Sequence, residues 1–368
     1  MKNTIQILSE LVALQSDTHK GTKNIADYIC NTLERHNVIF QRIPHTENNA
    51  ESIIAGINTG ALRDINSGIV LSGHMDTVAA TPEMWETPPF VATISDNKIF
   101  GRGVADMKYF IAIILGMLNE FKKYNFPILL VFTGDEESDA FGIRHICNFM
   151  AQNNITPKMA IIGEPTNSEI IIEHNGYCGY TTTIQGRAAH SSNLSNGINS
   201  IYIACELISH LQKLADTYVN SGTTINVGQI DGGQRRNIVP DNTSFEWEIR
   251  FAKVEHQKEI IKSMQDFQKH LEQKYINPVI KTHSAEHIFS LSASKNSKIS
   301  EIIANITHTN RSASTIATEA GFFANAGIDT VVFGTADINQ AHTANEHIDI
   351  NALGTYEQVL KEIINKLS

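Results

Sequence analysis

Histidines and carboxylates recur directly after apolar segments of this sequence. They are, in chain order, His74 and Asp76 in SGHMDTV, Asp106 in GRGVADMK, Glu136 and Glu137 in TGDEES, Glu164 in IIGEP, and His342 in INQAHTANE. The adjacent pair Glu136 and Glu137 is the most unusual, because two like charges beside a buried strand repel each other and lose solvation. A divalent cation would neutralise part of that charge, so the pattern indicates metal chemistry.

Imidazole and carboxylate ligands without thiolates suit Zn²⁺, with Co²⁺ or Mn²⁺ as substitutes. Two histidines and three carboxylates exceed the needs of one catalytic zinc ion, which takes three protein ligands and a water molecule. They fit two metal ions about 3.5 Å apart that share a bridging carboxylate. One glutamate of the pair then remains available as a general base. The alternative, a solvated acidic sheet edge, does not explain why histidines accompany the acids.

Alternating apolar segments must position these side chains. Predicted strands at 68–73, 127–134 and 159–165 alternate with predicted helices at 107–121 and 142–153. This order predicts an α/β fold with a mixed, mostly parallel sheet flanked by helices. In such a sheet, ligands bind at the carboxyl ends of the strands. The polar residues that follow the strands are therefore expected to meet at one edge of the sheet.

The middle of the chain has a different pattern. Its predicted elements follow the order β-α-β-β-α-β, which is typical of a ferredoxin-like arrangement. After it, a predicted helix at 296–308 and a strand at 329–334 return to the first pattern. We therefore predict a catalytic domain formed by 1–176 and 285–368, with an α+β domain inserted at 177–284.

Composition limits the class of partner. The chain has 368 residues and a formal net charge of −10, and an acidic chain argues against nucleic acid or an anionic membrane surface as the main partner. The four cysteines form no Cys-x-x-Cys pair, which fits a reducing compartment. Segment 1–17 has the apolar spacing of an amphipathic helix rather than the composition of a secretory leader. With no apolar run near twenty residues, these features predict a cytoplasmic protein that acts on small molecules.

The motifs SGHMDTV, GRGVADMK, GDEES, GEPT and QAHTANE, in this order and spacing, resemble those of the dinuclear zinc deacylase and exopeptidase family. That family includes acetylornithine deacetylases, succinyl-diaminopimelate desuccinylases, aminoacylases and glutamate carboxypeptidases. The resemblance covers the whole chain. It implies a zinc exopeptidase-like catalytic domain, an inserted ferredoxin-like lid that also forms a dimer, and two Zn²⁺ ions.

Within the family, the segments MWETPPFVATISDNKIFGRG, AIIGEPT, ATEAGFF and INQAHTANE are most similar to those of acetylornithine deacetylases. The resemblance thus implies hydrolysis of an N-acyl-amino acid, with N-acetylornithine giving ornithine and acetate for arginine synthesis. A succinyl-diaminopimelate desuccinylase, another deacylase or a dipeptidase-like activity is the alternative within the family. A non-catalytic metal- or amino-acid-binding protein is the alternative outside it, but a metal store needs no unliganded base such as Glu136.

The resemblance also implies a role for each polar residue. His74 and Glu164 would hold one metal ion, Glu137 and His342 the other, and Asp106 would bridge them. Asp76 would orient His74, as carboxylates commonly do for ligating histidines. Glu136 would take a proton from the attacking water and deliver it to the leaving amine. A cis peptide bond is implied between Asp106 and Met107.

Three residues of the inserted domain receive roles from the same resemblance. His190 in GRAAHSS would reach the active site of a partner subunit and donate to the oxyanion, which implies a homodimer. Asn237 in QRRNIVP and Arg250 in WEIR would bind the α-carboxylate of the substrate. Without the resemblance, the favoured interpretation of His190 is a loop histidine that caps a helix, and that of Arg250 is part of a surface salt bridge.

The sequence departs from the family pattern at three places. Tyr109 stands where the family usually has glycine after DMK, and we expect its ring to narrow the site. The segment GTADINQAH before His342 lacks the expected Pro-Gly turn. Arg235 and Arg236 add positive charge beside Asn237 and are predicted to be solvated. If they face the cleft, they would favour an acidic acyl-amino acid over cationic N-acetylornithine.

Overall fold

A computed structural model describes residues 1–17, 20–46, 50–138, 140–292 and 297–368. The chain folds into two compact units. The first comprises Met1–Glu173, Leu291–Ser314 and Thr318–Ser368, and the second comprises His174–Ser290 with Thr315–Ala317. The segment 177–284, which the sequence assigns to the inserted domain, lies within the second unit.

The first unit is built on a nine-stranded mixed sheet with the order β1-β2-β6-β3-β7-β17-β8-β15, and β16 pairs with β8. The strands are β1 (Ile39–Pro44), β2 (Glu51–Ile57), β3 (Ile69–His74), β6 (Ile128–Thr133), β7 (Met159–Ile162), β8 (Ile170–His174), β15 (Leu291–Ser292), β16 (Arg311–Ser314) and β17 (Asp329–Val332). The central strands β6, β3, β7 and β17 run parallel. All residues of β3, β6 and β7 are buried, as expected for parallel strands covered on both faces. The predicted mixed α/β sheet is confirmed.

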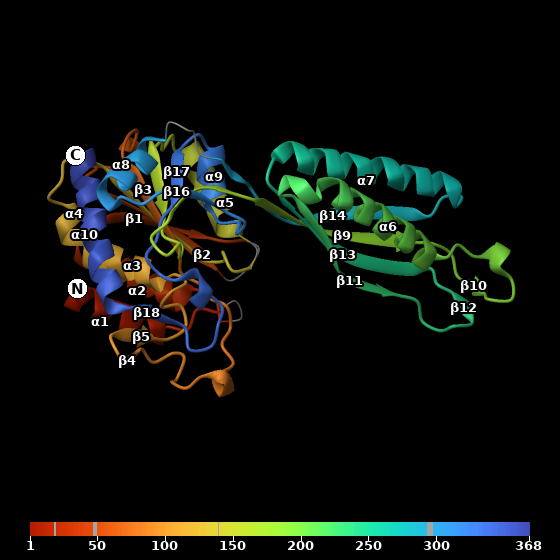
Figure 1. Ribbon diagram of the computed structural model, residues 1–368, viewed down its shortest axis with the longest axis horizontal. Helices are drawn as coiled ribbons and strands as arrows, with labels where there is room; N and C mark the ends of the chain where they lie inside the picture. Colours follow the sequence, from red (N-terminus) through yellow and green to blue (C-terminus); the bar gives the residue numbers. More distant parts are fainter. Residues whose placement is uncertain (18–19, 47–49, 139, 293–296) are drawn as a thin grey trace. The chain divides into compact units, whose positions relative to one another are not determined.

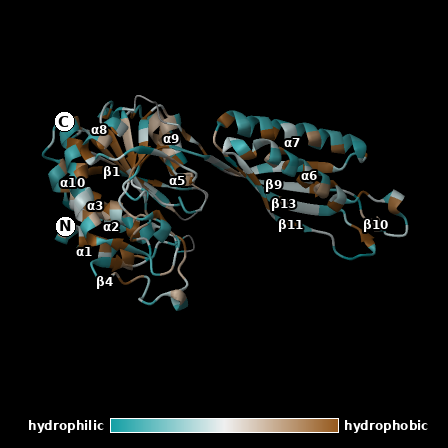
Figure 2. Cartoon of the chain, viewed as in Figure 1, coloured by the Kyte–Doolittle hydropathy of each residue, from teal (hydrophilic) through white to brown (hydrophobic). Residues whose placement is uncertain are grey.

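Helices cover both faces of this sheet (Figure 1). One face packs against α1 (Lys2–Ala13), α2 (Lys23–Arg35), α3 (Lys108–Gly116), α8 (Lys298–Thr307) and α10 (Ile350–Leu367), and the other against α5 (Phe141–Gln152) and α9 (Ala320–Asn325). Figure 2 shows the hydrophobic colour concentrated on the strands between these layers. The hydrophobic core thus lies between the sheet and the helices. The polar side chains that follow the strands lie at the edge of the sheet where the parallel strands end.

The predicted helix at 107–121 is interrupted in the structure. α3 ends at Gly116, and a short helix α4 (Leu118–Phe121) follows. A Cβ atom on Gly116 would lie 2.8 Å from Thr4 Oγ1, so glycine permits the close approach of α1. Glycine is also a weak helix former, which favours the break at this point.

A small antiparallel sheet, which the sequence analysis did not predict, completes the first unit. It has the order β18-β5-β4, formed by β18 (His347–Asp349), β5 (Lys98–Phe100) and β4 (Thr93–Ser95). It pairs the segment just before Arg102 with the segment just after Glu346. The small sheet therefore brings two distant motifs together.

The second unit has a four-stranded antiparallel sheet with the order β11-β13-β9-β14. Its elements follow along the chain as β9 (Gly176–Gln185), α6 (Ser200–Tyr218), β11 (Thr224–Gly232), β13 (Asn242–Phe251), α7 (Val254–Lys274) and β14 (Val279–Ile288). The predicted β-α-β-β-α-β order is present. Buried and exposed residues alternate along β13, and the buried ones pack against α6 and α7. A two-stranded ladder of β10 (Ala189–His190) and β12 (Ile238–Val239) extends from this unit.

Within the described ranges, none of the helices combines the length and the apolar character needed to cross a lipid bilayer.

Candidate active site

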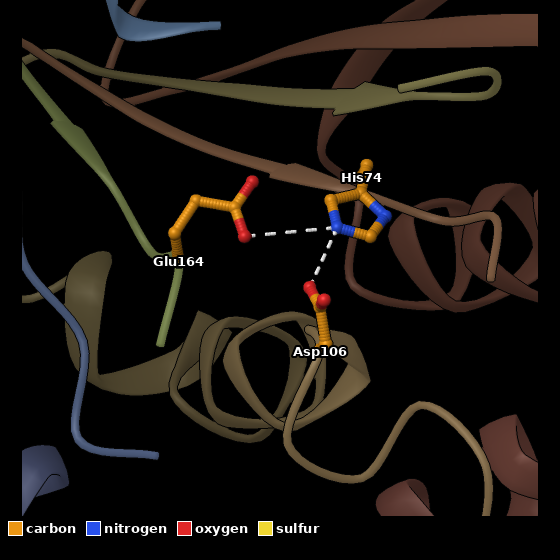
Figure 3. A group of neighbouring side chains, drawn as sticks. All are labelled: His74, Asp106 and Glu164. Atoms are coloured by element: carbon orange, nitrogen blue, oxygen red, sulfur yellow. Dashed lines mark hydrogen bonds and ion pairs between the residues drawn. The ribbon is translucent and has the colours of Figure 1, made fainter. Parts of the chain in front are cut away.

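Two neighbouring parallel strands place His74 and Glu164 together. β3 ends at His74, and β7 ends at Ile162, two residues before Glu164. Ser72 of β3 lies opposite Ile162 of β7, so both polar residues emerge at the same edge. The distance from His74 Nε2 to Glu164 Oε2 is 3.7 Å. Both side chains are buried, and Figure 3 shows them directed toward each other.

Asp106 joins this pair from the turn that precedes α3. Its Oδ1 lies 3.0 Å from His74 Nε2, and its Oδ2 lies 3.3 Å from His342 Nε2. Asp106 thus presents one oxygen to each histidine, as a bridging carboxylate would. The peptide bond between Asp106 and Met107 is cis, which confirms the expectation from the resemblance.

A second group forms around His342. Its Nε2 lies 2.9 Å from Glu137 Oε2, and its side chain is 54% exposed, whereas that of Glu137 is 7% exposed. A short 3₁₀ turn, Ile338–Gln340, capped by the side chain of Asp337, leads into His342. This turn stands where the sequence lacks the Pro-Gly turn of the family.

These residues form two overlapping sets of possible metal ligands. One set is His74, Asp106 and Glu164, and the other is Asp106, Glu137 and His342. Within each set, the candidate ligand atoms lie within 4.8 Å of one another. Imidazole nitrogens and carboxylate oxygens at this spacing fit a divalent cation of the zinc type. The shared Asp106 fits a site for two such ions.

Electrostatics of the site agree with a cationic occupant. Burial opposes protonation of His74, but the Glu164 and Asp106 carboxylates outweigh it and raise its pKa well above the usual value. Burial raises the pKa of Glu164 to about 7. Hydrogen bonds to Asp106 and Glu137 raise the pKa of His342 to about 10. In this crowded cluster, cations would supply the positive charge that the carboxylates require.

Asp76 fixes the loop that carries the two glutamates. Its Oδ1 accepts a hydrogen bond from the Glu136 amide at 3.2 Å, and its Oδ2 accepts one from the Glu137 amide at 2.9 Å. His74 Nδ1 lies 3.0 Å from the backbone oxygen of Asp76 and 3.5 Å from its Oδ1. The ring of His74 is therefore oriented mainly by the main chain of Asp76, while the carboxylate holds Glu136 and Glu137 in place.

Glu136 belongs to neither ligand set of the described residues. Its side chain is half-buried. Burial and the neighbouring Glu164 carboxylate raise the pKa of Glu136 well above its usual value, and Glu137 and His74 also act on it. Charged residues of both ligand sets therefore influence the pKa of Glu136, although Glu136 belongs to neither set. This is the placement that a general base beside a metal centre requires.

The predicted site residues of the second unit occupy two separate positions. His190 and Asn237 are exposed and neighbouring, because β10 pairs with β12 and His190 lies opposite Ile238. Arg250 lies near the far end of β13, where its Nε is 3.2 Å from Glu248 Oε1 and its guanidinium lies 5.1 Å from the centre of the Tyr177 ring.

The two places are well separated within the unit. The eight residue steps from Asn242 to Arg250 along β13 span roughly 26 Å. One copy of this unit therefore does not bring Arg250 together with His190 and Asn237. Arg235 and Arg236 are exposed.

Sequence reasoning assigned no role to Glu346, which the structure places at the base of the site. Its Oε2 accepts hydrogen bonds from Arg102 Nη1 at 2.7 Å and from the Gly103 amide at 2.9 Å. Its Oε1 accepts from the amides of Ala105 at 2.7 Å and Asp106 at 3.1 Å. Glu346 thus fixes the turn that presents Asp106. Its signal in the sequence is an acid four residues after His342.

Two further buried charged residues were also missed. Lys108 is fully buried and donates to the backbone oxygens of Leu11 at 3.1 Å and Leu14 at 2.9 Å, at the end of α1. Glu319 is buried, and burial raises its pKa to about 8. Their signals are a lysine at the start of an apolar helix and an acid within ATEAGFF.

Tyr109 was expected to narrow the site, but its ring is fully buried in the core. Its hydroxyl donates to the backbone oxygen of Gly163 and accepts from the amide of Thr335. The expectation is wrong because the first turn of α3 faces the sheet at this position, and not the opening.

A mixed α/β sheet whose strand ends gather two ligand sets that share one carboxylate is the arrangement of a dinuclear metallohydrolase. Residues 70–366 match the model of peptidase family M20/M25/M40, and the chain belongs to this family.

Relatives agree over nearly the full length. Acetylornithine deacetylase of Buchnera aphidicola subsp. Schizaphis graminum is 29% identical over 365 residues, which cover 96% of this chain and 93% of the relative. The crystal structure of a tripeptidase from Staphylococcus aureus superposes with a TM-score of 0.79 at 22% identity and covers 100% of this chain and 98% of its own. A dinuclear metal-binding peptidase from Bacillus subtilis gives a TM-score of 0.69 at 15% identity, with 100% and 98% covered.

The predicted resemblance and fold class are thus confirmed. Family membership also establishes that the chain is an enzyme, a metal-dependent hydrolase.

Proposed function

We propose that this enzyme hydrolyses the amide bond of an N-acyl-amino acid, with N-acetylornithine as the preferred substrate and two divalent cations, zinc first, as cofactors. The observation that carries the proposal is the division of the Asp106 carboxylate between His74 and His342, with Glu136 outside both ligand sets. The name of the relatives with high coverage supports the choice of substrate.

The ligands divide between the two ions as follows. His74 and Glu164 would hold one ion, Glu137 and His342 would hold the other, and Asp106 would be shared by both. Bound divalent cations supply positive charge that polarises an amide carbonyl and lowers the pKa of water. The exposed side of His342 leaves room for a substrate to approach this centre.

The chain's own residues manage the proton. Glu136 removes a proton from the attacking water and returns it to the nitrogen of the leaving amine, so that one carboxylate serves first as base and then as acid. Asp76 keeps Glu136 in reach by accepting the hydrogen bond of its amide. A store for metal ions would not require such an unliganded carboxylate, which favours catalysis over simple binding.

The lid residues support a homodimer. His190 and Asn237 lie at one end of the lid sheet and Arg250 toward the other, so a small substrate cannot contact all three in one copy of the unit. A homodimer would resolve this, because His190 and Asn237 of one copy would join Arg250 of the other copy at one substrate, whose α-carboxylate Arg250 and Asn237 would bind. His190 would then donate to the oxyanion.

The test is a comparison of kcat/KM on zinc-loaded protein for N-acetylornithine, N-succinyl-diaminopimelate, N-acetylcitrulline and a small dipeptide, each with a chelator control. We expect N-acetylornithine to give the highest value and the chelator to abolish turnover. A higher value for N-succinyl-diaminopimelate would overturn the choice of substrate and would direct attention to Arg235 and Arg236. Undiminished turnover after removal of the metal would overturn the mechanism.

A further inference from the structure

The hydroxyl of Tyr109 connects two strand-end segments beneath the site. It donates to the backbone oxygen of Gly163 at 2.8 Å and accepts from the amide of Thr335 at 3.1 Å. Gly163 follows β7, and Thr335 follows β17, the strand parallel to β7. Glycine is expected at position 109 from the resemblance, and glycine has no side chain that could make this connection.

The surroundings are shaped to receive this hydroxyl. A Cβ atom at position 334 would overlap both Tyr109 Oη and the backbone oxygen of Glu164, so only glycine fits there. A Cβ atom on Gly163 would overlap the ring of Phe110. The ring of Tyr109 packs edge-on against Phe110 and Tyr356, with ring centres 6.4 Å and 6.2 Å away.

Gly163 directly precedes Glu164. The backbone amide and the backbone carbonyl of Gly163 are both hydrogen-bonded. Its amide donates to Ser72 O at 3.0 Å, and its carbonyl accepts from Tyr109. The first bond ties Gly163 to β3, the strand that carries His74. The hydrogen bond from Tyr109 fixes the orientation of the peptide group between Gly163 and Glu164.

After Glu164, backbone hydrogen bonds connect the segment that follows β7 with the segment that follows β17. The amides of Asn167 and Ser168 donate to the backbone oxygens of Ala336 and Gly334 at 2.9 Å and 2.8 Å. These bonds join the same two segments without Tyr109. Loss of the hydroxyl would therefore leave the segments together and would free two backbone groups, the Gly163 carbonyl next to Glu164 and the Thr335 amide.

We propose that Tyr109 is a positioning residue for Glu164, which holds the Glu164 carboxylate toward His74 through the hydrogen bond to Gly163. The proposal rests on the proposed role of Glu164 as a metal ligand. The competing explanation is that Tyr109 only fills space in the core. Tyr109→Phe separates the two, because it keeps the ring and removes only the hydroxyl.

The matched control is Tyr356→Phe. Tyr356 is buried in the same aromatic cluster, and its hydroxyl also donates to a backbone oxygen, that of Phe333, at 2.5 Å. It touches neither Gly163 nor Thr335 among the described hydrogen bonds. Tyr109→Phe removes two buried hydrogen bonds and Tyr356→Phe removes one, so a purely structural effect should appear in both variants and at both halves of the site.

The experiment measures the dissociation constant of Co²⁺ by visible absorption at each half of the site separately. In a His342→Asn background, which leaves the half that contains Glu164, we expect Tyr109→Phe to weaken binding about tenfold. In a Glu164→Gln background, which leaves the other half, we expect a change below about twofold. Tyr356→Phe should change neither constant by more than about twofold.

Equal effects of Tyr109→Phe and Tyr356→Phe, or equal effects on both halves, would overturn the proposal and leave Tyr109 as a core residue. A wild-type chain that binds no Co²⁺ would overturn the proposed function, and the role of Tyr109 with it. The two failures are therefore distinguishable.

Discussion

Glu346 accepts a hydrogen bond from the amide of Asp106 at 3.1 Å, although the two residues are 240 positions apart in the chain. The same carboxylate pairs with Arg102 Nη1 at 2.7 Å, and both partners are buried. The segment that follows His342 thus builds the turn that carries Asp106. Both candidate ligand sets depend on this turn, since Asp106 belongs to both.

Glu346→Gln should destabilise the protein and weaken both metal positions together. The amide group of glutamine would face backbone N–H donors, and the charge of Arg102 would lose its buried partner, a defect that costs about 3–5 kcal/mol. Thermal unfolding and metal content check this. Glu120→Gln, a change in a surface carboxylate paired with Lys123 and Lys361, should alter the unfolding free energy by less than about 1 kcal/mol. A melting temperature for Glu346→Gln equal to that of Glu120→Gln would contradict the role of Glu346.

Removal of the shared ligand should differ from removal of a ligand that serves one ion. Asp106→Asn should lower the affinity of both metal positions, because both histidines contact this carboxylate. His342→Asn should lower only one. The metal-to-protein ratio after dialysis measures the difference: we expect close to none for Asp106→Asn and close to one for His342→Asn. Two tightly held ions in Asp106→Asn would show that Asp106 does not bridge.

His174 should make the protein sensitive to acid. It is buried at the end of β8, and burial lowers its pKa from 6.5 to about 4. Above pH 6.5 neither state binds the proton, so the stability is fully present. Between pH 6.5 and 4 only the unfolded state binds it, and the folded state loses about 3 kcal/mol relative to the unfolded state.

His174→Asn should therefore show a smaller fall in unfolding free energy between pH 7.5 and pH 4.5 than the wild type. Asparagine keeps an N–H donor for the backbone oxygen of Asn175, which His174 Nδ1 contacts at 2.9 Å. Parallel stability curves for the two proteins across this interval would contradict the prediction. Denaturant titration at each pH provides the measurement.

The strand ends and the lid could be predicted because local patterns determine them. Apolar runs followed by polar ligands predicted β3, β6 and β7, and the order of strands and helices predicted for the inserted domain matches the observed elements from β9 to β14. The predicted helix at 296–308 appears as α8, Lys298–Thr307; its first residue, 296, lies outside the described residues. The strands β1 and β2 were not predicted, because no metal-type ligand residue marks the end of either one.

Residues that act through distant partners could not be predicted. Glu346 contacts Gly103 and Asp106 across a chain separation of about 240 residues, beside the small sheet that pairs their segments. Tyr109 contacts Gly163 and Thr335, which lie 54 and 226 positions further along the chain. Sequence spacing gives no measure of such contacts. For the same reason, the expectation that Tyr109 would narrow the site failed, since the direction of its side chain depends on how α3 packs.

The most direct test of the central claim is Glu136→Gln, measured for metal content and kcat on the same preparation. Glutamine keeps the shape of the side chain and removes the base, while both ligand sets remain intact. We predict that two metal ions are retained and that kcat falls about 10²- to 10⁴-fold, whereas Glu137→Gln also loses metal. Wild-type turnover in Glu136→Gln with its metal bound would contradict the assignment of Glu136 as the base of a two-metal deacylase.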